Sequence, residues 1–197
     1  MNEATKAYAR RSTNPFYARV IRGEVLDIGC GHDLMPCVAF RDVTTVRGYD
    51  IIMGHKGAQT LADVGDESYD TIHSSHCLEH LHSPVTALFN WLRVLKPGGH
   101  MVVTVPDWDL YEHRQWPSIF NTDHKWVFTL SRELSVDEPH VLSVPLMLDA
   151  METLNMGQMC ACSRFGDGFD HQAPPTVDQT LGACECAIEF VFQKAIT

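Results

Sequence analysis

The chain has 197 residues, of which 45% are hydrophobic and 20% charged, and its formal net charge is −10. These values predict a single folded domain over residues 1–197, because one hydrophobic core serves domains of this size. Its lysines and arginines are scattered and form no basic stripe, so a nucleic acid is unlikely as a partner. No apolar run reaches the roughly 18–20 residues that cross a bilayer. The N-terminus also lacks the apolar core of a signal peptide. We therefore expect a cytoplasmic protein with no membrane partner.

Short β-type runs alternate with helical patterns up to about residue 107, which is typical of a parallel sheet with crossover helices. The expected strands in this part are 24–29, 44–50, 59–63, 69–75 and 100–106. Two further strands are expected near the C-terminus, at 157–165 and 184–194.

A helix is expected after the fourth of these strands. Its apolar residues recur at three- and four-residue steps, and they are Val85, Leu88, Leu92 and Leu95. Ser83 can cap its start, Pro84 suits the first helical position, and Pro97-Gly98-Gly99 ends it. A second helix is expected over 143–154.

The alternation fails from about 107 to 143, where an irregular insertion is expected beside the sheet's carboxyl edge. Its aromatic side chains either stack on an acceptor or form a small core of their own. They are Trp108, Tyr111, Trp116, Phe120 and Trp126.

The cysteines number seven, and an odd count without an export signal predicts free thiols. Two pairs have C-x-C spacing, which is too short for both thiolates to face one tetrahedral zinc ion. No metal site is predicted. The cysteines are Cys30, Cys37, Cys77, Cys160, Cys162, Cys184 and Cys186.

The stretch VLDIGCGHD (25–33) places a carboxylate inside the first strand and two glycines in the turn after it. Asp27 needs a partner because its apolar neighbours deprive it of water, and a cationic ligand would supply one. Gly29 and Gly31 let a ligand approach the main chain. A dinucleotide is disfavoured, because Leu34 replaces the third glycine of G-x-G-x-x-G and Asp33 would repel a pyrophosphate.

Asp50 ends the second expected strand, 19 residues after Gly31. An acid at this distance can accept hydrogen bonds from both hydroxyls of a ribose. The alternative is an ordinary aspartate in a turn.

The motifs VLDIGCG and YDTIHSSHCLEHLHSPVTALFNWLRVLKPGGHMVVTVPD (69–107) together resemble the class I S-adenosylmethionine-dependent methyltransferases of the compact methyltransferase-domain type. The resemblance spans about 24–107. It implies an α/β fold, with a doubly wound, mostly parallel seven-stranded sheet of order 3-2-1-4-5-7-6, an antiparallel last strand and helices on both faces. It also implies S-adenosyl-L-methionine as cofactor, whose positive charges suit an acidic turn.

The resemblance further implies which residues contact the cofactor. Around its methionine part and ribose these are Asp27, Gly29, Cys30, Gly31, Asp50 and Ile51. Around adenine they are Ala62, Asp63 and Val64, and after the fourth strand they are Ser75 and His76.

Methyl transfer needs a base only when the acceptor must lose a proton, as a hydroxyl must. The candidate bases are His76, His113 and His124, whereas His73 lies inside a strand and is expected to be a hydrogen-bonded core residue. Glu79 and His80 belong to the family's LEHL pattern, with a structural or a catalytic role.

The expected function is methyl transfer to oxygen of a small molecule or glycan precursor. The glycan acceptor is suggested by a second resemblance. The insertion resembles a subgroup of these methyltransferases that is often found near polysaccharide-synthesis genes, through the pattern D-L-Y-E … F-N-x-D-H-K-W. The alternatives are a non-catalytic S-adenosylmethionine-binding module and a transferase of the same fold that uses another adenosyl substrate. The oligomeric state is open.

Overall fold

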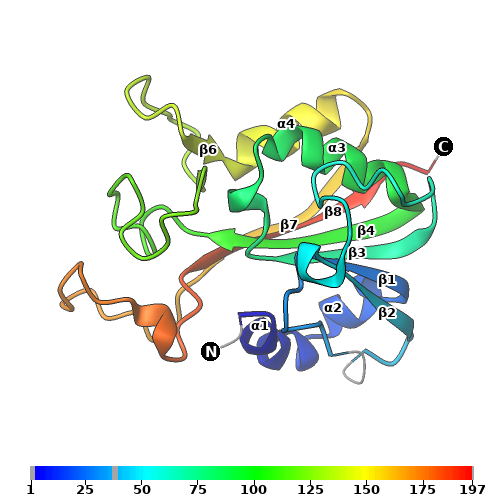
Figure 1. Ribbon diagram of the computed structural model, residues 1–197, viewed down its shortest axis with the longest axis horizontal. Helices are drawn as coiled ribbons and strands as arrows, with labels where there is room; N and C mark the ends of the chain where they lie inside the picture. Colours follow the sequence, from blue (N-terminus) through cyan, green and yellow to red (C-terminus); the bar gives the residue numbers. More distant parts are fainter. Residues whose placement is uncertain (1–2, 37–39, 197) are drawn as a thin grey trace.

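A computed structural model describes residues 3–36 and 40–196 and centres on a six-stranded sheet of order β2-β1-β3-β4-β8-β7 (Figure 1). The first four strands in the chain pair in parallel, and β8 is antiparallel to both its neighbours. This confirms the doubly wound fold. The strands are β1 (Gly23–Ile28), β2 (Val43–Tyr49), β3 (Tyr69–Ser75), β4 (Leu95–Pro106), β7 (Gly157–Phe165) and β8 (Ala187–Lys194).

Helices cover both faces of the sheet, as expected (Figure 1). On one face lie α1 (Glu3–Ser12) and α2 (Pro15–Val20), and on the other lie α3 (Pro84–Val94) and α4 (Val144–Thr153). The predicted cap of α3 is present, since the Ser83 hydroxyl accepts from the backbone N–H of Thr86. The two N-terminal helices carry no motif and were not predicted.

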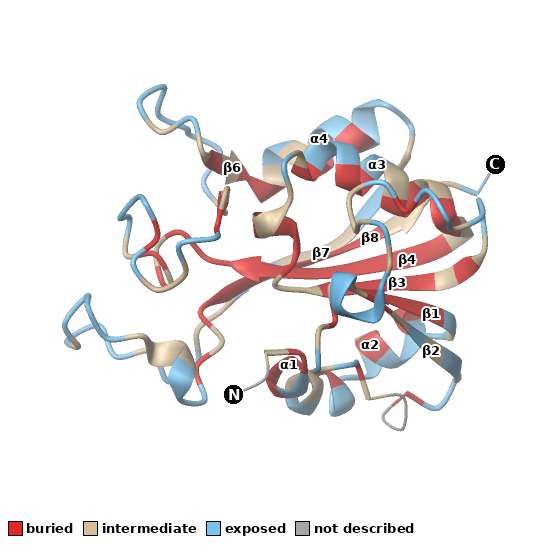
Figure 2. Cartoon of the chain, in the orientation of Figure 1, coloured by how far each residue is buried: buried red, intermediate tan, exposed pale blue. Residues whose placement is uncertain are grey.

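The alternation of side chains along β1 builds two hydrophobic cores. Leu26 and Ile28 pack in the larger core with Trp91 of α3, whereas Val25 packs on the opposite face with Ile21, next to α2. Figure 2 shows burial concentrated in the central strands, and both edge strands, β2 and β7, are largely exposed or half-buried.

The expected strand at 59–63 was wrong, so the sheet has six strands and β2 lies at its edge. The segment forms turns, and α3 side chains rather than a neighbouring strand donate to backbone carbonyls of residues 58–61. The bonds are Trp91 Nε1 to Ala58 O (2.7 Å), Asn90 Nδ2 to Gln59 O (3.1 Å) and Arg93 Nη2 to Leu61 O (2.9 Å).

The segment from 107 to 143 is mostly irregular and contains the short parallel pair β5 (Val127–Thr129) and β6 (Val141–Ser143). It projects past the carboxyl end of β4 (Figure 1). Single 3-10 turns form η2 (Ile51–Met53), η3 (Leu78–His80) and η4 (Gln179–Leu181).

Six cysteines lie in the described part of the chain and all are free, as predicted, while Cys37 lies outside it. Among the described helices, none has both the length and the apolar composition needed to cross a membrane.

A buried histidine in β4 should make folding stability depend on pH. Burial and the charge of Arg22 lower the pKa of His100 to about 4. In the unfolded chain this ring takes up a proton near pH 6.5, so acid favours unfolding below that pH. Between pH 7 and 5 the wild type should lose about 2 kcal/mol more unfolding free energy than His100→Gln. Urea unfolding at both pH values measures this, and equal losses would contradict it.

Candidate active site

The loops that follow β1, β2 and β3 meet at the carboxyl edge of the sheet. Gly29 has φ +72°, and a Cβ there would lie 2.4 Å from Cys77, so packing demands glycine. Gly31 has φ +51° with nothing within 4 Å of an added Cβ. The turn therefore offers bare backbone next to open space.

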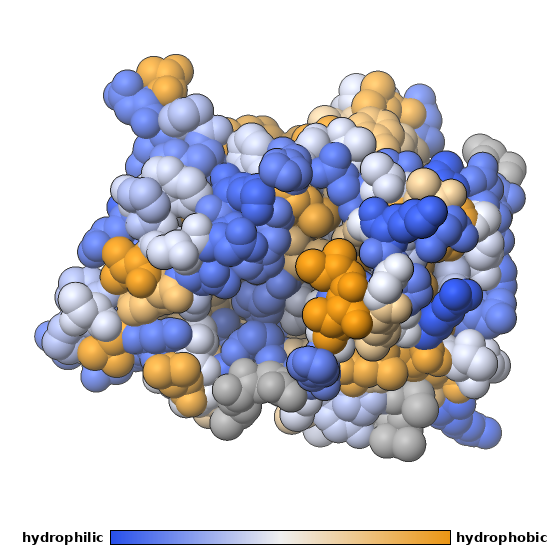
Figure 3. Space-filling view, in the orientation of Figure 1, coloured by the Kyte–Doolittle hydropathy of each residue, from blue (hydrophilic) through white to orange (hydrophobic). Residues whose placement is uncertain are grey.

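Two adjoining cavities open at this edge, and they share Gly29 and His76. The larger, of about 600 Å³, is lined among others by Asp50, Ile51, Cys77, His80, Asp123 and Lys125. The smaller, of about 180 Å³, is lined by Glu3, Asp27, Cys30, Asp33 and Ser75 among others. Figure 3 shows a hollow on this face, with apolar side chains gathered over η2 at its edge.

Asp27 has its partners inside the protein. Its Oδ2 accepts from the backbone N–H of Met35 at 2.7 Å, and its Oδ1 lies 2.6 Å from His73 Nδ1. His73 Nε2 lies 2.7 Å from Arg11 Nη1, which can only donate, so His73 donates to Asp27 through Nδ1. The prediction for His73 as a hydrogen-bonded core residue is confirmed. The burial of Asp27 is explained without a ligand, although its carboxylate still borders the smaller cavity.

Asp50 ties the second loop to the glycine turn. Its Oδ2 accepts from the backbone N–H of Gly31 at 2.9 Å, and its Oδ1 accepts from that of Ile52 at 3.0 Å. A carboxylate has about four acceptor positions, so both oxygens can accept a further bond from the larger cavity.

Ser75 and His76 follow β3. The Ser75 hydroxyl is buried and has no partner among the described residues. His76 lies between the cavities with φ +53°, and its Nδ1 is 3.6 Å from Glu79 Oε1. Burial alone would lower the pKa of His76, but the nearby charge of Glu79, with the charge of Glu3, raises it above its ordinary value.

A family model for a methyltransferase domain matches residues 1–134 of the chain. The chain belongs to this methyltransferase family. The prediction of a class I S-adenosylmethionine-dependent enzyme is confirmed, and S-adenosyl-L-methionine is its cofactor. No curated protein matches the methyltransferase.

Solved structures share the fold at low sequence identity. One is in the complex between the Haloferax volcanii Trm112 methyltransferase activator and a methyltransferase (14% identity, TM-score 0.62, covering 98% of this chain and 93% of that one). Another is an S-adenosylmethionine-dependent methyltransferase from Archaeoglobus fulgidus (16%, 0.58, 98% and 95%). A third is the Burkholderia thailandensis 1,6-didemethyltoxoflavin-N1-methyltransferase with bound S-adenosylhomocysteine (13%, 0.58, 96% and 79%).

The residues of the methyltransferase fit the cofactor's chemistry. Three acidic residues line the smaller cavity, Glu3, Asp27 and Asp33, and their negative charge suits an ammonium group, although Glu3 also pairs with Lys6 at 2.8 Å. The unpartnered Ser75 hydroxyl and the open space at Gly31 leave room for polar contacts with a ligand. Glu3 carries no sequence signal of a site residue, because an acid in the first turn of a helix is common.

The three residues predicted to contact adenine lie outside both cavities. None of Ala62, Asp63 and Val64 lines either cavity. Asp63 is exposed, and a hydrogen bond from the Tyr49 hydroxyl lowers the pKa of its carboxyl. The larger cavity is instead bordered on that side by residues 57–59.

The candidate bases lie in three different settings in the methyltransferase. His76 lines both cavities, whereas neither His113 nor His124 lines one. The His113 ring packs 6.0 Å from that of Phe120 and 5.9 Å from that of Phe169. His124 is buried, with Nδ1 2.7 Å from Glu112 Oε1.

The aromatic side chains of the insertion largely pack within the protein. Trp108 is buried with Val127 and Val141 in a small core. Trp126 Nε1 donates to the backbone carbonyl of Leu81 at 3.0 Å. The rings of Tyr111 and Phe120 meet edge to face at 5.5 Å, and Trp116 stacks on His140 at 4.3 Å. These contacts support the alternative of a local core over acceptor stacking.

Proposed function

We propose that the methyltransferase transfers a methyl group to a hydroxyl oxygen of a small-molecule or glycan-precursor acceptor. The observation that carries this proposal is the larger cavity, which extends from Asp50 to Asp123 and Lys125 of the insertion. Cofactor and acceptor can therefore share one continuous space. S-adenosylmethionine supplies the activated methyl group, and the protein's task is to align the acceptor with it.

The proposed cofactor contacts are the predicted residues that lie at the two cavities. They are Asp27, Gly29, Cys30, Asp50, Ile51, Ser75 and His76. We add Gly31, which lines neither cavity but donates its backbone N–H to Asp50. Asp50 would accept from the ribose hydroxyls, and the carboxylates of the smaller cavity would face the amino group. Residues 57–59 take the place of Ala62, Asp63 and Val64 at the adenine.

His76 is the proposed base. A hydroxyl loses its proton during attack, and a base must lie within reach of that proton. His76 lines both cavities, which supports this role, whereas His113 and His124 line neither.

Calorimetry tests the cofactor part of this proposal. Titration with S-adenosylmethionine and with S-adenosylhomocysteine should each give one site per chain, and titration with NAD should give none. Binding of NAD alone would contradict the proposal.

Acceptor chemistry needs a separate assay. The purified enzyme should be incubated with S-adenosylmethionine and paired hydroxyl and amine acceptors, including sugar nucleotides, and S-adenosylhomocysteine release measured. We expect release with a hydroxyl acceptor and a product methylated at oxygen. Turnover confined to amines would exclude the oxygen proposal while leaving the cofactor site intact.

A further inference from the structure

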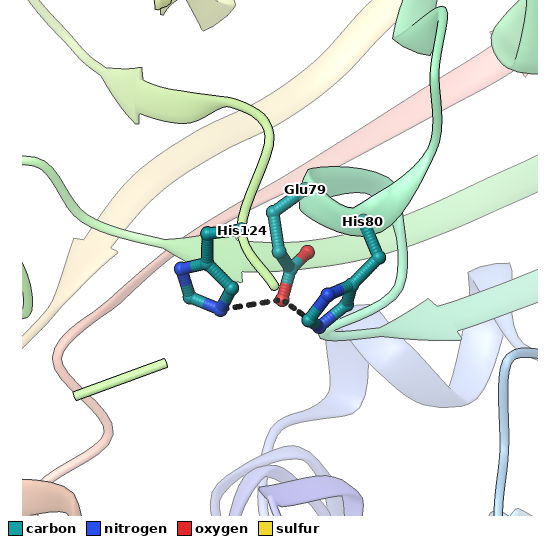
Figure 4. Close-up of side chains that lie close together, drawn as sticks. All are labelled: Glu79, His80 and His124. Carbon is teal, nitrogen blue, oxygen red and sulfur yellow. Dashed lines mark ion pairs between the residues drawn. The ribbon is translucent and has the colours of Figure 1, made fainter. Parts of the chain in front are cut away.

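Three side chains beside the larger cavity point toward one another (Figure 4). His80 Nε2 lies 3.8 Å and His124 Nε2 3.9 Å from the same oxygen, Glu79 Oε1. The three donor atoms all lie within 4.8 Å of one another. Two imidazoles and one carboxylate form a donor set that proteins use for divalent metals.

Glu79 is the least satisfied group of this cluster. It is 0% exposed, and neither carboxylate oxygen has a hydrogen-bond partner within the described chain. Burying a carboxylate without hydrogen bonds is costly, and proteins usually pair such groups or coordinate them to a metal. The imidazoles of His76, His80 and His124 lie 3.6, 3.8 and 3.9 Å from Oε1, beyond hydrogen-bond distance, so a protonated histidine or a metal ion must balance the charge of Glu79.

Both histidines are already oriented for a metal. His124 Nδ1 lies 2.7 Å from Glu112 Oε1, and His80 Nδ1 lies 3.0 Å from Asp123 Oδ2. If each Nδ1 donates to its carboxylate, each Nε2 is left as a free acceptor facing Glu79. Metal-binding histidines almost always make this outer hydrogen bond, which sets the tautomer and the ring orientation.

We propose that Glu79, His80 and His124 bind one divalent transition-metal ion, with zinc as the expected ion. Imidazole donors suit zinc, whereas magnesium and calcium take oxygen ligands. A point equidistant from three donors so spaced lies at most about 2.5 Å from each, so shifts of no more than about 0.4 Å give zinc distances of about 2.1 Å. This proposal replaces the sequence-based expectation of no metal.

The backbone brings the two halves of the site together. Glu79 and His80 lie in η3, and the carbonyl of Glu79 accepts from the backbone N–H groups of Lys125 (2.8 Å) and Trp126 (3.2 Å). These two bonds place His124 against η3. A short zinc-ligand motif does not occur here, because Glu79 and His80 lie in η3 whereas His124 lies far along the chain in the insertion. The sequence spacing therefore does not predict the site.

The metal site is also placed to bind the methyl acceptor, an inference that rests on the proposed function. His80 lines the larger cavity together with Asp123. Three protein ligands leave at least one position open on a tetrahedral zinc ion. An oxygen of the acceptor could occupy that position and be held beside the cofactor, where the metal would favour its deprotonated form.

The competing explanation is a metal-free cluster in which protonated histidines balance Glu79. Calorimetry on the chelator-treated full chain, without S-adenosylmethionine, separates the two. Zinc chloride should bind at one site per chain, and magnesium chloride should bind far more weakly. Absence of zinc binding would overturn the proposal. Since S-adenosylmethionine binding is measured separately, failure here is distinguishable from failure of the proposed function.

Variants locate the site. Glu79→Gln and His124→Gln should each weaken zinc binding by about 100-fold or more, and Glu112→Gln by about 10-fold to 100-fold. The exposed His171→Gln should leave it unchanged. Circular dichroism checks that each variant folds. Unchanged zinc affinity in a folded Glu79→Gln protein would overturn the proposal.

Zinc bound by cysteine thiols would be the main false positive in this titration, because Cys184 Sγ lies 3.2 Å from Cys186 Sγ. Zinc binding lost in Cys184→Ser but kept in Glu79→Gln would place the ion at the thiols and overturn the proposal. A measurement on the wild type covers the case of unfolded variants. Its cobalt(II) complex should lack a thiolate-to-metal absorption band, and a strong band would count against the site.

Discussion

Replacing Asp50 by alanine should weaken S-adenosylmethionine binding by about 100-fold, because hydrogen bonds to a charged group contribute about 1.5–3 kcal/mol each. In the proposed site the carboxylate accepts from two ribose hydroxyls, and it also holds Gly31 through a 2.9 Å bond. The substitution thus removes ligand contacts and releases the glycine turn. Calorimetric titration of both proteins measures the change.

A matched acid distinguishes this effect from loss of negative charge. Asp66 has a side chain 70% exposed, pairs with Arg93 and borders neither cavity. Asp66→Ala should therefore bind S-adenosylmethionine within about 3-fold of the wild type, since exposed ion pairs contribute little. Asp50→Asn keeps one acceptor oxygen, so its affinity for S-adenosylmethionine should lie between those of Asp50→Ala and Asp66→Ala. Wild-type affinity in a folded Asp50→Ala protein would remove Asp50 from the ribose site.

Local patterns predicted most of the fold. Strands β3 and β7 have the predicted bounds, and α3 begins at the expected proline after its serine cap. These features depend on residues close together in the chain, such as the alternation of a strand or the cap of a helix. The strand predicted over 59–63 was wrong because the side chains that bond the backbone there belong to α3, which is distant in the sequence.

The candidate site also contains some residues that local patterns predict and others that they do not. The glycine turn and Asp50 were predicted as site residues because each directly follows a strand, and parallel strands end at one edge of the sheet. Glu112 and His124 come from an irregular segment whose path no periodicity describes. Their position against Glu79 depends on backbone bonds to residues 125 and 126, which the sequence pattern does not reveal.

Asp27 shows the limit of an argument from one residue. The sequence predicts a partner for this buried acid and suggests a cationic ligand. In the structure the partner is His73 of β3, which is bonded to Arg11 of α1. A buried acid indicates that a partner exists without showing whether it is a ligand or another side chain. Here the same acid belongs to a buried network and borders the smaller cavity.

The centre of that network is Glu189 of β8, and Glu189→Gln should lower the unfolding free energy by about 3–5 kcal/mol. Its carboxylate accepts from the guanidinium groups of Arg10 and Arg11, from the Tyr17 hydroxyl and from the Thr104 hydroxyl. Arg11 and Glu189 have side chains only 1% exposed. The variant would leave buried arginine charge without its anion, which is the costly way to break such a pair.

The effect should also depend on pH. Burial alone would raise the pKa of Glu189, but the charges and hydrogen bonds of Arg11 and Arg10 hold it well below its usual range. The unfolded glutamate titrates near pH 4.3. The stabilisation is therefore complete above that pH and is lost as the pH falls toward the folded-state pKa. The difference between wild type and variant should be largest at neutral pH and should shrink below about pH 4.

Glu24→Gln is the matched control, since Glu24 also lies in a strand but its side chain is 54% exposed and pairs with Lys96. Removal of its charge should change stability by less than about 1 kcal/mol. Urea unfolding of the three proteins at pH 7 and at acid pH gives the comparison. Equal losses for the two variants at pH 7 would mean that the network around Glu189 stabilises the fold no more than an exposed pair. Because Arg11 also bonds His73, which orients Asp27, loss of this network should loosen the smaller cavity as well as the sheet.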